Sequence, residues 1–322
     1  MKNLVENFYR HILEALELPI PFFEAPQNFQ NVVIAGLGGS GIAGVMVKKM
    51  LENTFSLPIQ TLSSYDVPEY VNEKTFFITA SYSGDTEESL TMFEKAKQKG
   101  AFLVTICSGG LLEKISKDQH IPCILIPKGN PPRAAIAYSL VLMFRIFASL
   151  GLSVFSLKKW KDLALFLEKN QENFQKTAQK YVDFFINKIP IIYSSEKNEA
   201  LAIRFRQQLS ENSKMLAWHH VIPEMTHNEI MGWEGKTSNF VVLFLKLGNE
   251  NEREKLRFDF LQETIEEKGI TVKTLPYFGE TFEEYYFSAL QILDFISVFL
   301  AEKQDIDPTP VTTIRQLKDR LL

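Results

Sequence analysis

Cysteine, excess positive charge and long apolar runs are all scarce in this sequence. Its 322 residues include two cysteines, Cys107 and Cys123, which excludes a disulfide-rich secreted scaffold and favours buried thiols in a reducing cytoplasm. The formal net charge is −4, so the chain lacks the concentrated positive field that nucleic acids and membrane surfaces attract. No uninterrupted apolar run reaches the roughly 18 residues of a membrane span. Glu6 and Glu14 give the N-terminal segment the pattern of an amphipathic helix and not of a signal peptide.

Apolar segments that alternate with helical ones are, by contrast, abundant. Hydrophobic residues make up 45% of the chain, and continuous apolar runs such as NVVIAG and KTFFITA predict a parallel sheet covered on both faces. The same pattern returns after a charged segment without glycine or proline. We therefore predict an α/β protein with two doubly wound, flavodoxin-like parallel-sheet domains. The predicted parts are an N-terminal helix with the first domain at 1–153, a helical linker at 154–187, and the second domain with a C-terminal tail at 188–322.

The turn after the first strand raises a choice between a dinucleotide and another phosphate. The stretch VVIAGLGGSGIAG satisfies the dinucleotide spacing G-x-G-x-x-G at Gly36, Gly38 and Gly41. A dinucleotide site also needs an acidic residue about 20 residues further on, at the end of the next strand, to bind the ribose. The acid in that region, Asp66, comes several residues late. The turn therefore does not favour a nicotinamide cofactor, and we expect no cofactor.

A second turn between strand and helix is rich in hydroxyl groups. Ser81, Ser83 and Thr86 lie close together in SYSGDTEESL. Gly84 permits an unusual backbone turn, and Thr86 is placed to cap a helix that begins with two glutamates. Hydroxyls, backbone N–H groups and a helix N-terminus together form a phosphate cradle without a lysine. Ser40 adds a hydroxyl from the first turn, so we predict a phosphate site where the strands end.

These two turns resemble the sugar isomerase (SIS) domain, which binds phosphosugars through a loop rich in serine and threonine. The resemblance extends along the chain, because five motifs occur in the order found in bifunctional phosphoglucose/phosphomannose isomerases. Two positions depart from the family: Asp85 stands in place of Asn, and Ala43 in place of Gly. Asp85 would weaken phosphate binding if its charge pointed inward. The motifs are GLGGSGIAG, SYSGDTEESL, NPPRAAIAYSL, ENSKM with PEMTHNEIMGW, and DPTPVTTIRQLKDRL.

The resemblance implies two SIS domains and a metal-independent aldose–ketose isomerase. Such an enzyme interconverts glucose 6-phosphate and/or mannose 6-phosphate with fructose 6-phosphate through a cis-enediolate. Glu211 is then the base that moves a proton between C2 and C1, and Arg133 stabilises the enediolate with a permanent, planar charge. His227 opens the sugar ring, since its usual pKa of about 6.5 suits proton exchange near neutral pH, and Lys318 assists it. The implied substrate-binding residues are Gly39, Ser40, Ser81, Ser83 and Thr86.

The resemblance also implies a homodimer, because the superfamily's corresponding histidine reaches the site from the second subunit. Other functions stay open at this point. The chain could be an SIS isomerase of another phosphosugar specificity, or a non-catalytic regulator that binds phosphosugars. A regulator needs no base, so the joint presence of Glu211, Arg133 and His227 argues against it.

A metal site is a further alternative for the segment HHVIPEMTHNE. Zinc motifs on a helix need histidines at positions i and i+4, but Pro223 interrupts any helix here. Adjacent histidines on a strand face opposite ways. We therefore expect no metal site. The potential ligands weighed are His219, His220, Glu224, His227 and Glu229.

Overall fold

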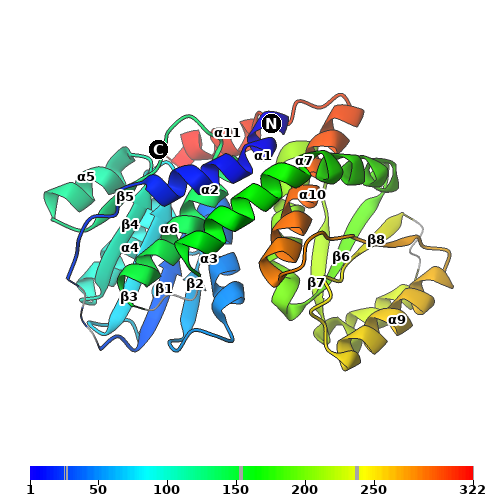
Figure 1. Cartoon of the computed structure of the whole chain (residues 1–322), viewed down its shortest axis with the longest axis horizontal. Helices are drawn as coiled ribbons and strands as arrows, with labels where there is room; N and C mark the ends of the chain where they lie inside the picture. The colour runs from blue at the N-terminus through cyan, green and yellow to red at the C-terminus, as the bar shows by residue number, and fades with distance from the viewer. Residues whose placement is uncertain (25, 27, 152–154, 236–238, 322) are drawn as a thin grey trace. The chain divides into compact units, whose positions relative to one another are not determined.

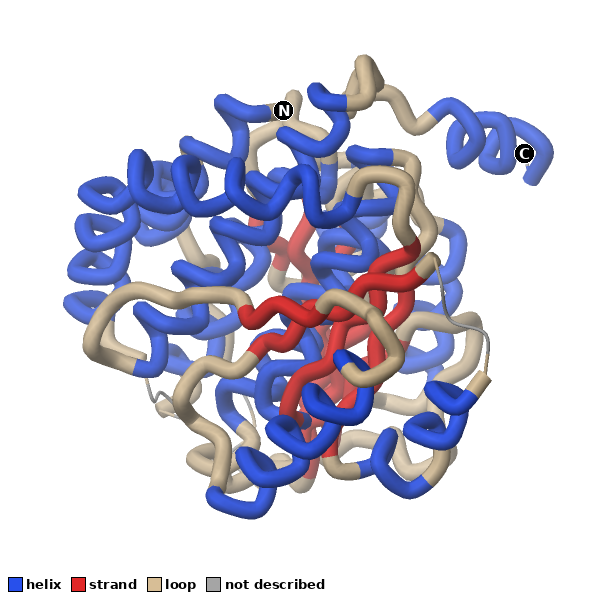
Figure 2. The backbone as a smooth tube through the Cα atoms, turned by 90° about the vertical axis from the view of Figure 1, so that its right-hand side faces the viewer, coloured by secondary structure: helices blue, strands red, loops and turns tan. Residues whose placement is uncertain are grey.

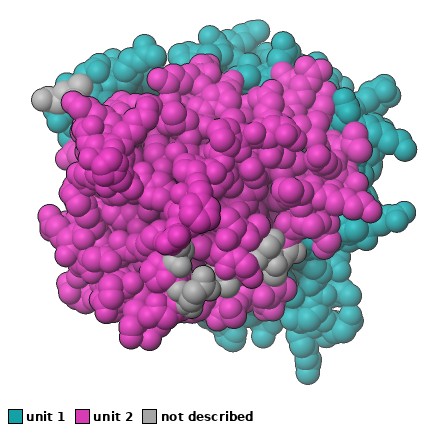
Figure 3. All heavy atoms as spheres, turned by 60° about the vertical axis from the view of Figure 1, so that its left-hand side comes forward, with its two compact units in different colours: residues 1–6, 166–322 teal, residues 7–165 magenta. Residues whose placement is uncertain are grey.

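Parallel sheets flanked by helices form the framework, which confirms the predicted fold class. The chain forms two compact units, residues 7–165 and residues 1–6 with 166–322 (Figure 3). Each unit contains one sheet. The structure is a computed structural model (Figure 1). It describes residues 1–24, 26, 28–151, 155–235 and 239–321.

The sheet of residues 7–165 has the strand order β2-β1-β3-β4-β5, and all neighbours pair in parallel. This 2-1-3-4-5 order is that of flavodoxin-like folds. Val33 and Phe77 pack with α4 and α5 in one core cluster, while α6 covers α3 and α2. The strands are β1 (Asn31–Ala35), β2 (Ile59–Leu62), β3 (Thr75–Ser81), β4 (Phe102–Cys107) and β5 (Cys123–Leu125). The helices are α2 (Phe8–Glu17), α3 (Gly38–Leu51), α4 (Glu87–Gln98), α5 (Gly110–Asp118), η1 (Pro132–Ala134) and α6 (Ile136–Ser149).

The second unit has a four-stranded parallel sheet in the order β7-β6-β8-β9. Figure 2 shows the strands in red among the blue helices. The edge strand β7 buries only Ile222 fully, so its sequence lacks the apolar run that predicts the other strands. The strands are β6 (Ile189–Ser195), β7 (Trp218–Ile222), β8 (Phe240–Leu245) and β9 (Val272–Thr274). The helices are α1 (Lys2–Glu6), η2 (Glu196–Asn198), α8 (Glu199–Ser213), η3 (Glu224–His227), η4 (Glu229–Glu234), α9 (Glu252–Glu266), α10 (Phe282–Lys303) and α11 (Thr312–Leu321).

Helix α7 (Leu157–Phe185) lies within the segment predicted as a helical linker. It is a single helix of 29 residues that contributes to both compact units. The predicted boundary between residues 153 and 154 lies outside the described residues. The domain limits therefore stay a prediction.

The N-terminal segment forms two helices where the sequence predicts one. Helix α1 ends at Glu6 and α2 begins at Phe8, with Asn7 between them. Helix α1 belongs to the second unit, where Val5 is buried and the Lys2 ammonium lies 5.7 Å from the centre of the Phe299 ring of α10. Because of this break, α1 and α2 belong to different compact units.

The two cysteines lie on neighbouring strands. Cys107 is buried at the end of β4, Cys123 is half-buried at the start of β5, and both are free thiols with sulfurs 3.7 Å apart. Hydrogen bonding to Cys123, followed by burial, raises the pKa of Cys107. The same hydrogen bond lowers the pKa of Cys123 to about 7. Both thiols were predicted to be buried. This prediction is confirmed for Cys107, whereas Cys123 is only half-buried.

Helix α10 is long and apolar enough to cross a membrane by length and composition, and it is the one such helix among the described residues. However, 89% of its most apolar window is buried inside the structure. Helices α8 and α1 pack against it. Its composition is therefore that of a core helix.

Candidate active site

The two hydroxyl-rich turns follow adjacent strands at one edge of the first sheet. Strands β1 and β3 pair in parallel with Ala35 opposite Thr79, so the turns that follow them are neighbours. A Cβ atom on Gly36 would lie 2.7 Å from the Ala80 carbonyl oxygen, so this approach requires glycine. Ser40 and Ser81 are both buried there, at 4% and 3% exposure.

Hydrogen bonds within the turn fix its serine and threonine side chains. The Ser81 hydroxyl donates to Thr86 Oγ1 at 3.0 Å and accepts the Gly84 N–H at 3.2 Å. Ser83 Oγ accepts the Asp85 N–H at 3.2 Å. The predicted cap by Thr86 holds for its position and not for a side-chain hydrogen bond. Thr86 precedes α4, but its side chain makes no capping hydrogen bond, because its hydroxyl is turned toward Ser81.

Glycine is obligatory at the centre of this turn. Gly84 has a φ of +77°, and a Cβ atom there would lie 1.8 Å from the Gly109 carbonyl oxygen. The turn therefore packs directly against the start of α5, where the Leu112 N–H donates to the Gly84 carbonyl at 2.9 Å.

Asp85 does not turn its charge into this cradle. Its Oδ1 accepts the Leu111 N–H at 2.7 Å, in the first turn of α5. A helix N-terminus stabilises a carboxylate, so the residue that departs from the family pattern has a partner of its own.

Arg133 lies beside the first turn. A Cβ atom on Gly39 would lie 2.5 Å from the Pro132 carbonyl oxygen, so glycine lets η1 pack against the start of α3. Arg133 is 4% exposed. The structure thus brings Gly39, Ser40 and Arg133 together with the turn of residues 81–86 at one edge of the sheet.

Tyr82 is a site residue that sequence reasoning missed. Its hydroxyl donates to the Pro127 carbonyl at 3.0 Å and accepts the Asn130 N–H at 2.9 Å. These bonds tie the hydroxyl-rich turn to the segment that leads to Arg133. The sequence could have indicated Tyr82, because a large side chain within the polar turn SYSGD needs a packing partner.

Glu211 occupies the C-terminal part of α8 in the second unit, and it is half-buried. A ladder of buried polar contacts holds α8 on α10. Arg204 Nη2 lies 2.6 Å from Asp294 Oδ2, and Gln208 Nε2 donates to Asp294 Oδ1 at 3.2 Å. Further along, Asn212 Nδ2 donates to the Ser297 hydroxyl at 2.9 Å. The position of Glu211 is therefore fixed from inside the unit.

The C-terminal tail begins beside the same end of α8. Lys214 follows this helix with a φ of +55°, and its ammonium donates to the carbonyls of Glu211 and, at 2.9 Å, Pro310. Lys318 lies on α11, which buries none of its residues. The tail that carries Lys318 thus starts at the Glu211 end of the unit.

His227 ends η3 and is exposed. Buried groups anchor the backbone around it. The Tyr193 hydroxyl donates to Glu229 Oε1 at 2.6 Å and accepts the Trp233 indole N–H at 3.2 Å. Burial, followed by the bond to Glu229, raises the pKa of Tyr193. Sequence reasoning missed Tyr193, because its partners Glu229 and Trp233 belong to another element, η4.

Glu211 and His227 lie at opposite ends of strand β7. Helix α8 leads into the first residue of β7, whereas η3 follows its last residue. The five residues of β7 span about 16 Å at roughly 3.3 Å per residue. The unit therefore does not bring the predicted base and the predicted ring-opening histidine to one point.

The histidines of β7 do not form a cluster with other metal ligands. In the part of the chain that the structure describes, no three His, Cys, Asp or Glu side chains gather as a metal site requires. Burial, then Arg206 and His220, lowers the pKa of His219 to about 4. His219 is therefore neutral at pH 7.

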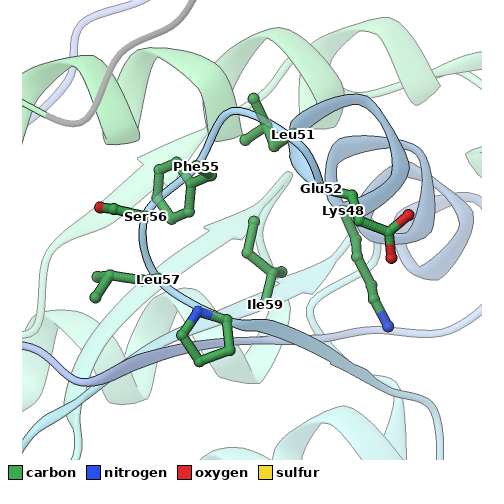
Figure 4. Close-up of a pocket in the computed structure, with 8 residues that line it drawn as sticks. Lys48, Leu51, Glu52, Phe55, Ser56, Leu57 and Ile59 are labelled. Carbon is green, nitrogen blue, oxygen red and sulfur yellow. The ribbon is translucent and has the colours of Figure 1, made fainter.

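A cavity of about 300 Å³ lies between the end of α3 and the start of the edge strand β2 (Figure 4). Figure 4 shows Lys48 on α3 and Glu52 just after this helix, with Phe55 and Leu57 on the loop before β2. None of the predicted site residues lines it. Its lining is Lys48, Leu51, Glu52, Phe55, Ser56, Leu57, Pro58 and Ile59.

Comparison with known proteins points to one family. The model of the bacterial phospho-glucose isomerase C-terminal SIS domain matches residues 174–321. A bifunctional phosphoglucose/phosphomannose isomerase of Caldicellulosiruptor bescii is 33% identical over 308 residues, covering 92% of this chain and 90% of the relative. One of Aquifex aeolicus is 31% identical over 296 residues, or 91% of each chain. The chain belongs to the bifunctional phosphoglucose/phosphomannose isomerase family.

Membership in the bifunctional phosphoglucose/phosphomannose isomerase family confirms the resemblance drawn from the five motifs. The fold alone is shared more widely. Glucosamine-6-phosphate deaminase of Thermotoga maritima has a TM-score of 0.69 at 16% identity, covering 97% of this chain and 95% of that one.

Proposed function

We propose that this chain is a cytoplasmic, metal-independent aldose–ketose isomerase that interconverts glucose 6-phosphate and mannose 6-phosphate with fructose 6-phosphate. One observation carries the proposal. The hydroxyl-rich turn of residues 81–86, buried Ser40 and buried Arg133 converge at the carboxyl edge of one sheet. Relatives that are named for both isomerase activities, over nine-tenths of the chain, support it.

The hydroxyl-rich turn binds the phosphate in this proposal. The hydroxyls of Ser83 and Thr86 and the N-terminus of α4 offer hydrogen-bond donors to an anion, and the Ser81 hydroxyl orients Thr86 by donating to it. Gly39 and Ser40 contribute the start of a second helix, α3. Two helix N-termini that meet at one sheet edge favour negative charge there.

Glu211 performs the proton transfer in this proposal, and Arg133 stabilises the intermediate. Glu211 takes the C2 proton from the open-chain aldose and returns it to C1, as a general base and then acid. Arg133 stabilises the negative charge that grows on the enediolate oxygens. His227 and Lys318 assist the preceding ring opening.

The active unit is a homodimer in which His227 comes from the second subunit. The positions of Glu211 and His227 at opposite ends of β7 support this arrangement, because the strand separates the two residues within one copy. A twofold dimer supplies two equivalent sites by exchanging the same pair of surfaces.

Dual specificity follows from the chemistry. Glucose 6-phosphate and mannose 6-phosphate differ only at C2, and removal of the C2 proton makes that carbon planar. Both sugars therefore give the same cis-enediolate, and one base serves both if the C2–C3 bond can rotate.

Incubation of each aldose phosphate in deuterated water tests the function. Both should give fructose 6-phosphate, with solvent deuterium at C1, and a chelator should leave the rates unchanged. Turnover of glucose 6-phosphate alone would leave a monofunctional isomerase. Binding of both sugars without turnover would instead indicate a regulator.

Replacement of Ser83 and Thr86 by Ala should mainly raise KM. Each hydrogen bond to a charged group contributes about 1.5–3 kcal/mol, so the double variant should raise KM by about 100-fold or more. Steady-state kinetics measures the change. Thr54→Ala/Ser56→Ala is a matched control near the opposite edge of the same sheet, and an unchanged KM in Ser83→Ala/Thr86→Ala would contradict the assigned phosphate site.

A further inference from the structure

The two sheets place equivalent turns after equivalent strands. Their orders, β2-β1-β3-β4-β5 and β7-β6-β8-β9, make β8 the counterpart of β3, because each is the third strand of its unit and pairs with the first. The turn after β3 leads to α4, and the turn after β8 leads to α9. The third residue of each turn is a glycine with positive φ, Gly84 at +77° and Gly248 at +78°.

The second turn is one residue longer, and Glu250 lies in the part that is lengthened. When Gly84 is matched to Gly248 and the helix-preceding Thr86 to Asn251, two residues, Asn249 and Glu250, stand where the first turn has Asp85 alone. The second turn also lacks a serine or threonine hydroxyl. The two turns thus share a backbone plan but differ in the groups that would meet a phosphate.

The Glu250 carboxylate occupies the backbone donors of this second turn. It is 6% exposed. Its Oε1 accepts the Leu247 N–H at 2.9 Å and the Asn198 amide at 3.3 Å, while its Oε2 accepts the Gly248 N–H at 3.0 Å. Leu247 and Gly248 correspond to Ser83 and Gly84 of the proposed phosphate turn. Successive backbone N–H groups beside a helix N-terminus bind anions, and here the anion belongs to the chain.

We propose that Glu250 is an internal anion that fills the second unit's counterpart of the phosphate turn and so confines phosphosugar binding to the first unit. The assignment of residues 81–86 as the phosphate turn is part of the proposed function, on which this inference rests. Ser195, the last residue of β6, supports the comparison. It is fully buried at the same edge, and its hydroxyl has no hydrogen-bond partner among the described residues.

Replacement of Glu250 by Ser tests the proposal by opening the turn. The variant is made in the Ser83→Ala/Thr86→Ala chain, and inorganic phosphate is titrated while backbone amide resonances are followed. We expect saturable shifts of the Leu247 and Gly248 amides in the Glu250→Ser chain. We expect none at these amides in the parent chain or with Glu252→Ser, which removes an exposed carboxylate at the start of α9.

The absence of saturable shifts at Leu247 and Gly248 in the Glu250→Ser chain would overturn the proposal. So would phosphate-dependent shifts of these amides with Glu250 intact. The amides of Ser83 and Gly84 in the unmodified chain report separately on the proposed function, so its failure is distinguishable.

A second measurement applies if Glu250→Ser does not fold. Glu250→Gln keeps the shape of the side chain but removes its charge, and a bound anion stabilises the folded state. Phosphate should therefore raise the Tm of Glu250→Gln by more than that of the unmodified chain. An equal rise in both would contradict the proposal.

Discussion

Replacement of Glu211 by Gln should lower kcat by about 10²–10⁴-fold and leave KM nearly unchanged, because the amide keeps the shape of the side chain but cannot accept the C2 proton. Steady-state kinetics with either aldose phosphate measures the loss. Glu263→Gln on α9 is a matched control that should keep full activity. A near-normal kcat in Glu211→Gln would show that another group moves the proton.

Glu211→Gln also tests the dimer when it is co-expressed with His227→Ala. Each variant alone should be nearly inactive on ring-closed substrate. If His227 acts across the interface, a mixed dimer holds one intact site, and random pairing should restore about a quarter of normal activity. No recovery, with mixed dimers demonstrated by two affinity tags, would place both residues in one chain.

Replacement of Asp294 by Ala should destabilise the second unit by about 3–5 kcal/mol, because it leaves the Arg204 charge buried without its carboxylate. Arg204 and Asp294 are 4% and 2% exposed. Denaturant unfolding measures the change. Activity should fall with stability, since the same contacts hold the helix that carries Glu211.

The surface pair of Asp183 and Lys303, 3.5 Å apart, supplies the control for this prediction. Asp183→Ala should cost less than about 1 kcal/mol. Arg204→Met/Asp294→Leu should restore most of the stability lost in Asp294→Ala, because well-packed apolar residues replace buried ion pairs at little cost. A loss below about 1 kcal/mol in Asp294→Ala would contradict the role given to this pair.

The fold was largely predictable because its central strands are apolar on both faces. Strands β1, β3, β6 and β8 are nearly continuous runs of buried residues, so their sequence departs clearly from that of loops. The edge strand β7 gives no such signal, because two histidines interrupt it. The break at Asn7 was also not predictable, since the amphipathic pattern continues across it.

Only those parts of the candidate site whose residues are close together in the sequence could be predicted. The hydroxyls of Ser81, Ser83 and Thr86 are close in sequence, and the structure brings them close in space. The role of Tyr82 depends on partners more than 40 residues away, Pro127 and Asn130, which no local pattern contains. The catalytic assignments of Glu211, His227, Arg133 and Lys318 stay predictions.

The membership of residues 1–6 in the second unit has a consequence for synthesis on the ribosome. Helix α1 emerges before residues 7–165, yet it packs with α10, which emerges after residue 281. Residues 7–165 carry a whole sheet and its covering helices, so that unit can fold while the rest is still being translated. The second unit is complete only when α10 packs with α1.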